Sequence, residues 1–290
     1  MLAGPGPRAF PARLPPVRPL LVRLLVACLL LACLIATGSG IGAARAGATN
    51  QSTIDGPGIG TLLATHGAWE VRCEPGAHPL DMRCALVQRV TSEMDPDVGL
   101  FVIALKSADG ATMLRVMAPL GVLLGSEVSD EACGVRRPRG GLGLFVRLPI
   151  SPPVVARVGA GGVITAALPD RIRAVSDVKP CDTVTVRGGG EPPGPVPVAS
   201  TKDGTVRLEG YRGSLDTVTL TSVTEYIGTA PFLRCLTSGC MTEEVLTGRL
   251  QAKLEAASFA FFVLHRSVDS PGIGIPISLN GFREGLMALP

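Results

Sequence analysis

The sequence predicts an all-β protein, a sandwich of two sheets with one or two short helices. Three observations lead to this prediction. From residue 66 onward, short apolar runs alternate with turns rich in Gly, Pro and Asp. There is no regular alternation of strands and helices of the kind that builds a parallel sheet. An even number of cysteines follows residue 46, as in a disulfide-stapled exported domain.

The first hairpin is predicted from alternation and a turn. Trp69, Val71 and Cys73 recur every second residue, so they share one face of a strand. Prolines and a glycine at 75–79 predict the turn, and residues 83–88 the return strand. We expect Trp69 in the core beside a disulfide, which is more common in sandwiches than a binding role for such a residue.

The remaining elements outside the centre follow from similar patterns. Residues 99–105 and 113–118 are apolar strands joined by Asp109-Gly110, a hairpin signal. Residues 258–264 and 273–279 are also expected as strands, the second at an edge because it contains Pro276. A helix is expected from Thr242, with acid in its first turn and with Leu246, Leu250 and Leu254 on one face. A short helix is expected at 281–289.

The central segment, residues 126–225, has a different composition. It contains 24 Gly and Pro residues in 100, and the run from Gly188 to Pro195 is incompatible with a helix or a regular strand. We expect an insertion or a small extra β unit between two parts of one sandwich, 66–125 and 226–290. Its β-like runs lie at 142–148, 154–158, 163–168, 183–187, 205–209 and 217–223.

The N-terminus has the order of a secretory signal. Arginines among prolines precede an apolar run from Leu24 to Ala36, whose 13 residues are fewer than the roughly 20 of a membrane span. Small residues surround Arg45, so cleavage is expected after Ala46, followed by a leader at 47–65. The alternatives are an uncleaved membrane anchor and lipoprotein processing at Cys28, although Cys28 lies inside the apolar run.

Removal of the signal changes the charge of the chain. Residues 1–46 hold five arginines and no acidic residue, which leaves 22 basic and 24 acidic residues. The remainder has no basic patch with interleaved aromatic residues, so nucleic acid is not an expected partner. Contact with a membrane is expected only through an uncleaved signal.

Six cysteines remain after cleavage, and they allow 15 pairings. Spacing favours one disulfide within each close pair and leaves the two distant cysteines for each other. A zinc site is the alternative, but the spacing lacks the Cys-x2-Cys of zinc ribbons, and it lacks the motif of thiol oxidoreductases. We expect Cys73–Cys84, Cys235–Cys240 and Cys133–Cys181, with no metal and no cofactor.

Candidate catalytic residues are few. The histidines are His66, His78 and His265, none in a catalytic motif, and the sequence has neither a Gly-x-Ser-x-Gly elbow nor a phosphate-binding loop. The adjacent carboxylates of Glu243 and Glu244 would diverge on a helix. Asp95 and Asp97 flank Pro96 in a turn, where a solvated loop is more common than a cation site. No catalytic residue is therefore expected.

Two blocks of sequence resemble the invasion-associated locus B family of exported bacterial proteins. The first block contains HGAWEVRC at 66–73, RCALVQ at 83–88, VGL at 98–100 and LRVMAPLGVLL at 114–124. The second contains FLRCLTSGC at 232–240 and GIGIPISLNGF at 272–282. The resemblance covers about 66–125 and 226–290, and 126–225 has no counterpart in it.

The resemblance implies an immunoglobulin-like β-sandwich in the periplasm or outside the cell. It also implies a role at the cell envelope named for host-cell invasion, with no catalytic residues to carry over. The expected function is therefore non-catalytic binding of an unknown protein or of an envelope or host-surface component. The alternatives are a purely structural periplasmic protein and a hydrolase.

Overall fold

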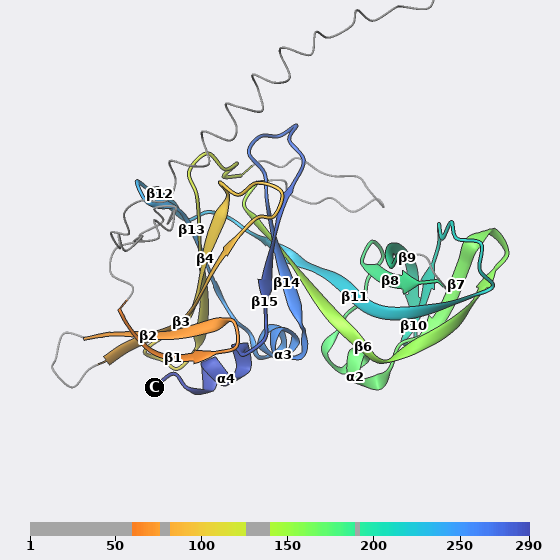
Figure 1. The fold of residues 1–290 in the computed structure, drawn as a ribbon, viewed down its shortest axis with the longest axis horizontal. Helices are drawn as coiled ribbons and strands as arrows, with labels where there is room; N and C mark the ends of the chain where they lie inside the picture. The colour runs from red at the N-terminus through yellow and green to blue at the C-terminus, as the bar shows by residue number, and fades with distance from the viewer. Residues whose placement is uncertain (1–59, 76–81, 126–139, 189–191) are drawn as a thin grey trace, which may run out of the picture. The chain divides into compact units, whose positions relative to one another are not determined.

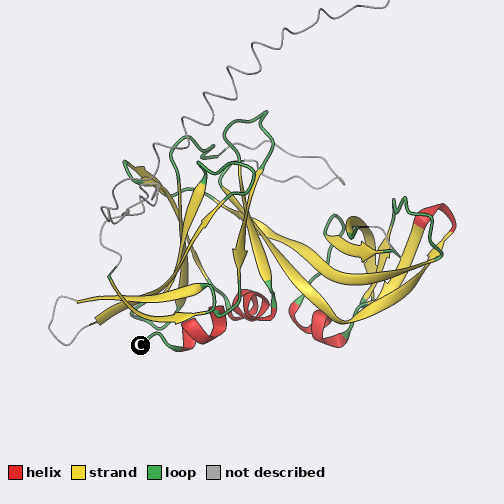
Figure 2. Ribbon diagram, in the orientation of Figure 1, coloured by secondary structure: helices red, strands yellow, loops and turns green. Residues whose placement is uncertain are grey.

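The computed structural model describes residues 60–75, 82–125, 140–188 and 192–290. The predicted signal and most of the leader lie outside these residues, as do His78 and Cys133. The predicted all-β class is confirmed, because strands dominate the described chain and helices are short (Figure 2). None of the helices described has both the length and the apolar character needed to cross a bilayer.

The first sheet of the described chain is antiparallel and has seven strands in the order β1-β2-β3-β4-β5-β13-β12. The five N-terminal strands form a meander, and β13 joins it beside β5. The strands are β1 (Thr61–His66), β2 (Trp69–Pro75), β3 (Met82–Thr91), β4 (Gly99–Lys106), β5 (Thr112–Ala118), β12 (Arg234–Leu236) and β13 (Gly239–Val245).

The second sheet follows the order β11-β8-β9-β10-β7-β6-β14-β15, and β11 also pairs with β6. This additional pairing closes the run from β6 to β11 on itself, so that part of the chain forms a closed sheet (Figure 1). The strands are β6 (Leu142–Gly159), β7 (Val163–Ala167), β8 (Thr183–Arg187), β9 (Gly194–Lys202), β10 (Thr205–Leu208), β11 (Thr217–Ala230), β14 (Phe259–Leu264) and β15 (Ile273–Ser278).

Strand β6 belongs to both the sandwich and the closed sheet. Its residues Gly143–Arg147 pair with β14, and Val158 and Gly159 pair with β7. β11 pairs with β6 along almost its whole length, and with β8 from Thr219 to Thr224. Residues 142–150 therefore lie in the sandwich sheet, which moves the N-terminal boundary of the central segment from 126 to about 151.

One apolar core runs through both parts of the structure. In the sandwich it includes Trp69, Leu86 and Phe282, and inside the closed sheet it includes Ile164 and Leu208, all nearly inaccessible to solvent. Alternate residues of each strand supply these side chains, because successive side chains point to opposite faces of a sheet. Closure of the central sheet also protects strand edges that would otherwise be exposed.

The helix predicted from Thr242 is wrong at its start. Residues 239–245 form β13, which pairs with β5, and the helix α3 begins at Gly248 and ends at Ala256. Thr247 caps α3 by accepting a hydrogen bond from the Leu250 N–H. Leu250 and Leu254 lie on α3, whereas Leu246 precedes it. Two shorter elements in the central segment are η2 (Ala160–Gly162) and α2 (Asp170–Val175).

The other terminal elements match the prediction. The strands expected at 258–264 and 273–279 are β14 and β15, and β15 with Pro276 is an edge strand. The short C-terminal helix is α4 (Phe282–Met287).

The turn after β4 contains Asp109. A hydrogen bond from the Ser107 hydroxyl, with a second from the Ala111 N–H, lowers the pKa of the Asp109 carboxyl.

We predict that two deletions of the central segment behave differently. Replacing 151–220 by Asn-Gly joins Ile150 to Thr221 in a two-residue hairpin, because Pro149 already pairs with Ser222. This chain should stay soluble and unfold cooperatively, at lower stability because β11 loses β8. Joining Gly125 to Tyr226 also removes the buried residues of 142–150, so that chain should aggregate. Size-exclusion chromatography and thermal unfolding compare the two, and equal behaviour would contradict the shared-strand arrangement.

Candidate functional site

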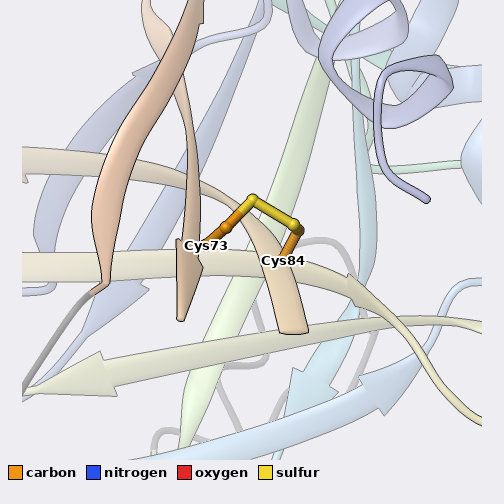
Figure 3. The surroundings of a disulfide bond; sticks show 2 residues. All are labelled: Cys73 and Cys84. Carbon is orange, nitrogen blue, oxygen red and sulfur yellow. A yellow bond between two sulfur atoms is a disulfide. The ribbon is translucent and has the colours of Figure 1, made fainter. Parts of the chain in front are cut away.

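Trp69 and the first disulfide lie together at the start of the sandwich. The predicted Cys73–Cys84 bond joins residues directly opposite each other on β2 and β3 (Figure 3). Trp69, on the same strand, is fully buried and packs on Phe282, with ring centroids 5.0 Å apart. Its Nε1 donates a 2.8 Å hydrogen bond to the Ser278 carbonyl oxygen. Trp69 is therefore part of the core and not available to a ligand.

The second disulfide, Cys235–Cys240, joins β12 to β13, again between paired residues. The hairpin that it closes exposes two large apolar side chains, Leu233 at 60% and Leu236 at 57%. Cys181 is buried just before β8, and its proposed partner Cys133 lies outside the described residues. The Cys133–Cys181 bond stays a prediction.

The two described histidines lie at strand ends and far from each other in the sequence. His265 follows β14, and its Nδ1 is 3.1 Å from the Ser270 carbonyl oxygen, a backbone group and not a nucleophile. His66 ends β1, and its Nε2 is buried with no hydrogen-bond partner among the described residues. A catalytic histidine needs a nucleophile or a substrate proton within reach, and the contact of His265 with a backbone carbonyl oxygen supplies neither.

The two adjacent carboxylates diverge, but on a strand and not on a helix. Glu243 faces one side of β13, where its Oε2 lies 2.6 Å from Arg115 Nη2. Glu244 faces the opposite side, the side that the buried Thr242 occupies. They therefore have different surroundings and do not converge on one substrate.

The two turn carboxylates, Asp95 and Asp97, have different surroundings. Asp95 accepts a 2.8 Å hydrogen bond from Arg266, and Asp97 is exposed. Within the described ranges, no cluster of three or more His, Cys, Asp or Glu side chains has the geometry to hold a metal ion.

The sequence analysis missed a buried polar cluster of the described chain. Glu225 of β11 and Lys253 of α3 form an ion pair, and both are buried, with exposed fractions of 2% and 7%. The hydroxyl of Ser176, the residue after α2, donates to the other oxygen of Glu225. The available signals were a glutamate inside an apolar strand and a lysine between the leucines of a helix; the pairing itself depends on long-range folding.

The contacts around this cluster tie α2, β11 and α3 together. Asp182, also buried, accepts hydrogen bonds from the backbone N–H groups of Lys179 (2.8 Å) and Tyr226 (3.0 Å). Arg249 of α3 forms an exposed ion pair with Asp177. The cluster therefore connects the helix of the C-terminal block to the segment that the family-like blocks flank.

The cluster does not have the contacts of a serine activated by a lysine. Activation of a serine by a lysine requires that the lysine accept the serine proton. Here the Ser176 hydroxyl donates a hydrogen bond to one oxygen of the Glu225 carboxylate, and the Lys253 ammonium forms an ion pair with the other oxygen. The arrangement neutralises a buried charge and leaves no acceptor directed at Ser176.

The comparisons with known proteins agree with the resemblance in the sequence. The model of the Invasion associated locus B (IalB) protein family matches residues 69–131 and 215–290. The chain belongs to the IalB family. The gap in the match, 132–214, contains β6 to β10, so five of the six strands of the closed sheet lie outside the match, and the sixth, β11, lies inside it.

One solved structure was also matched. The crystal structure of invasion associated protein B from Bartonella henselae shares 13% identity with this chain, with a TM-score of 0.37. The likeness covers 78% of this chain and 93% of that one. No curated protein matches this sequence.

We predict that Lys253→Met destabilises the protein by about 3–5 kcal/mol, because the buried Glu225 loses its counter-charge. The double variant Lys253→Met/Glu225→Gln should recover part of this loss, since no charge is then left unpaired. Arg249→Met is the matched control on the same helix, and loss of its exposed ion pair should cost about 0–1 kcal/mol. Urea unfolding measures all three, and equal losses for Lys253→Met and Arg249→Met would contradict this role of the cluster.

Proposed function

We propose that the protein is exported to the bacterial cell envelope and acts there by binding a protein partner, without catalysis. Membership of the IalB family and the two disulfides support export, because stable disulfides form outside a reducing cytoplasm. In this proposal the signal ends at Ala46 and the mature chain starts at Gly47. The partner is a protein of the envelope or of the host-cell surface.

The observation that carries the proposal is the segment Pro231–Cys240, which we call the stapled hairpin. Leu233 and Leu236 are mostly exposed on it, and the exposed Arg234 lies between them. The Cys235–Cys240 bond and a 2.8 Å hydrogen bond from Leu233 N–H to the Met241 carbonyl oxygen fix its backbone. Apolar side chains on a fixed backbone lose little conformational freedom when a partner covers them.

The position of the stapled hairpin also supports a family-type role. It lies inside the second segment matched by the family model, whereas the closed sheet lies mostly outside the match. Arginine, which the hairpin presents at Arg234, is enriched in protein–protein interfaces, where a few residues supply most of the binding energy. We therefore assign the partner contact to this hairpin and not to the closed sheet.

The non-catalytic part of the proposal rests on the contacts of the candidate groups. Ser176 donates a hydrogen bond to the carboxylate with which Lys253 forms an ion pair, and His265 faces a backbone carbonyl oxygen. Neither arrangement activates a nucleophile. A hydrolase would show turnover of peptide, ester, glycan or phosphate substrates that is lost when one polar residue is changed.

We predict that Leu233→Ser/Leu236→Ser weakens partner binding roughly tenfold or more, since each truncated contact at an interface centre costs about 1 kcal/mol or more. Val155→Ser is the control, because Val155 is 71% exposed on β6, outside the family match. Quantitative pull-downs from envelope and host-membrane extracts compare the three chains.

Two results would contradict the proposal. One is a partner that binds the double variant as tightly as the wild type. The other is an equal loss of binding in Val155→Ser, which would indicate a nonspecific hydrophobic effect. Retention of every binding partner by all three chains would favour the purely structural periplasmic role.

A further inference from the structure

An apolar cavity of about 250 Å³ lies between the two sheets of the sandwich. This volume is larger than the roughly 150 Å³ of an engineered protein cavity that binds benzene. Aliphatic and aromatic side chains form most of the wall of the cavity. They are Leu114 and Val116 of β5, Leu142 and Leu144 of β6, Ile227 of β11, Leu250 of α3 and Phe262 of β14.

The cavity lies where both sheets end at an edge. β8 pairs with β11 only as far as Thr224, and β12 pairs with β13 only as far as Met241. The residues of β11 and β13 that line the cavity come after these points; they are 227–230 of β11 and Thr242, Glu244 and Val245 of β13. A bulge at Ile227 interrupts the pairing of β11 with β6, and bulges often occur next to functional sites. A side chain at Gly228 would meet no atom within 4 Å, so the wall is open there.

Thr242 supplies an unused polar atom to this wall. It is 3% exposed and lines the cavity, and its backbone lies opposite Val116 in the β5–β13 ladder. Its Oγ1 is buried and has no hydrogen-bond partner among the described residues. A buried hydroxyl without a partner destabilises the fold, and a ligand in the cavity would supply the missing partner.

Glu244 supplies a charge at the rim of the cavity. It follows Thr242 by two residues, so it faces the same side of β13, about 7 Å further along the strand. It is exposed and lines the cavity, whereas Glu243 faces the other side and pairs with Arg115. The described lining contains no Lys, Arg or His, and its one formal charge, on Glu244, is negative. This favours a cationic ligand group and disfavours an anionic one.

We propose that the cavity binds a small aliphatic amine. The alkyl chain occupies the apolar space between the sheets, and the ammonium group donates hydrogen bonds to the Glu244 carboxylate and to Thr242 Oγ1. The site is separate from the stapled hairpin and does not depend on the protein partner proposed above.

The test uses n-octylamine as the probe on the mature chain, with 1-octanol and octanoate as ligands of equal length. Calorimetry should give affinities in the order octylamine, octanol, octanoate. In NMR spectra, the methyl groups of Leu114, Val116 and Leu144 should shift on titration with octylamine, and those of Leu233 and Leu236 should not.

Adjacent residues give matched variants for the charge. Glu244→Gln should weaken octylamine binding roughly tenfold, to about the affinity for octanol, because a charge-assisted hydrogen bond is lost. Glu243→Gln should leave octylamine binding unchanged. Thr242→Val should weaken both octylamine and octanol binding and raise the melting temperature, since it removes the unpaired hydroxyl.

Three outcomes would overturn the proposal. The first is the absence of saturable octylamine binding at millimolar concentration. The second is octanoate binding as tight as octylamine binding, and the third is an equal effect of Glu243→Gln and Glu244→Gln. Because both glutamates have partly or fully solvent-accessible side chains on one strand, neither variant should impair folding.

Discussion

The hydrogen-bonded ladder between β6 and β11 is the constraint on which the rest of the structure depends. The two strands pair from Leu142 with Ala230 to Arg157 with Thr217. At one end β6 also pairs with β14 of the sandwich, and at the other end with β7 of the closed sheet. A slip of one residue would turn the apolar side chains of both parts outward at once, so the two parts share one register.

The buried cluster of Ser176, Glu225 and Lys253 fixes a third element to this ladder. Glu225 lies on β11 opposite Val146 of β6, and Lys253 brings α3 against it. Burial of an ion pair contributes little net stability, but loss of one partner is costly. The cluster therefore favours one docking position of α3 over others. The cavity lies beside this position, because Leu250 of α3 is part of its wall.

Local patterns were sufficient for the parts of the fold that depend on neighbouring residues. Alternation around Trp69, the close cysteine pairs and Pro276 at an edge strand all gave the observed structure. Residues 242–245 of β13 were predicted as helix, because β13 is held by β5, a strand distant in the sequence. Arg115 of β5, which contacts Glu243, lies 128 residues from it. For the same reason, the closed sheet, the Glu225–Lys253 pair and the polar lining of the cavity could not be predicted from local sequence.

Hydrogen exchange along β6 tests the shared ladder most directly. β8 pairs with β11 across the irregularity between Leu220 and Ser222, so it bridges the two halves of the ladder. The account predicts that the amides of Val146 and Leu148, in the sandwich half, exchange with the same opening free energy as those of Val154 and Ala156, in the closed-sheet half. Exchange of Val154 and Ala156 by a separate, much less costly opening would contradict it and would show two independently folded units.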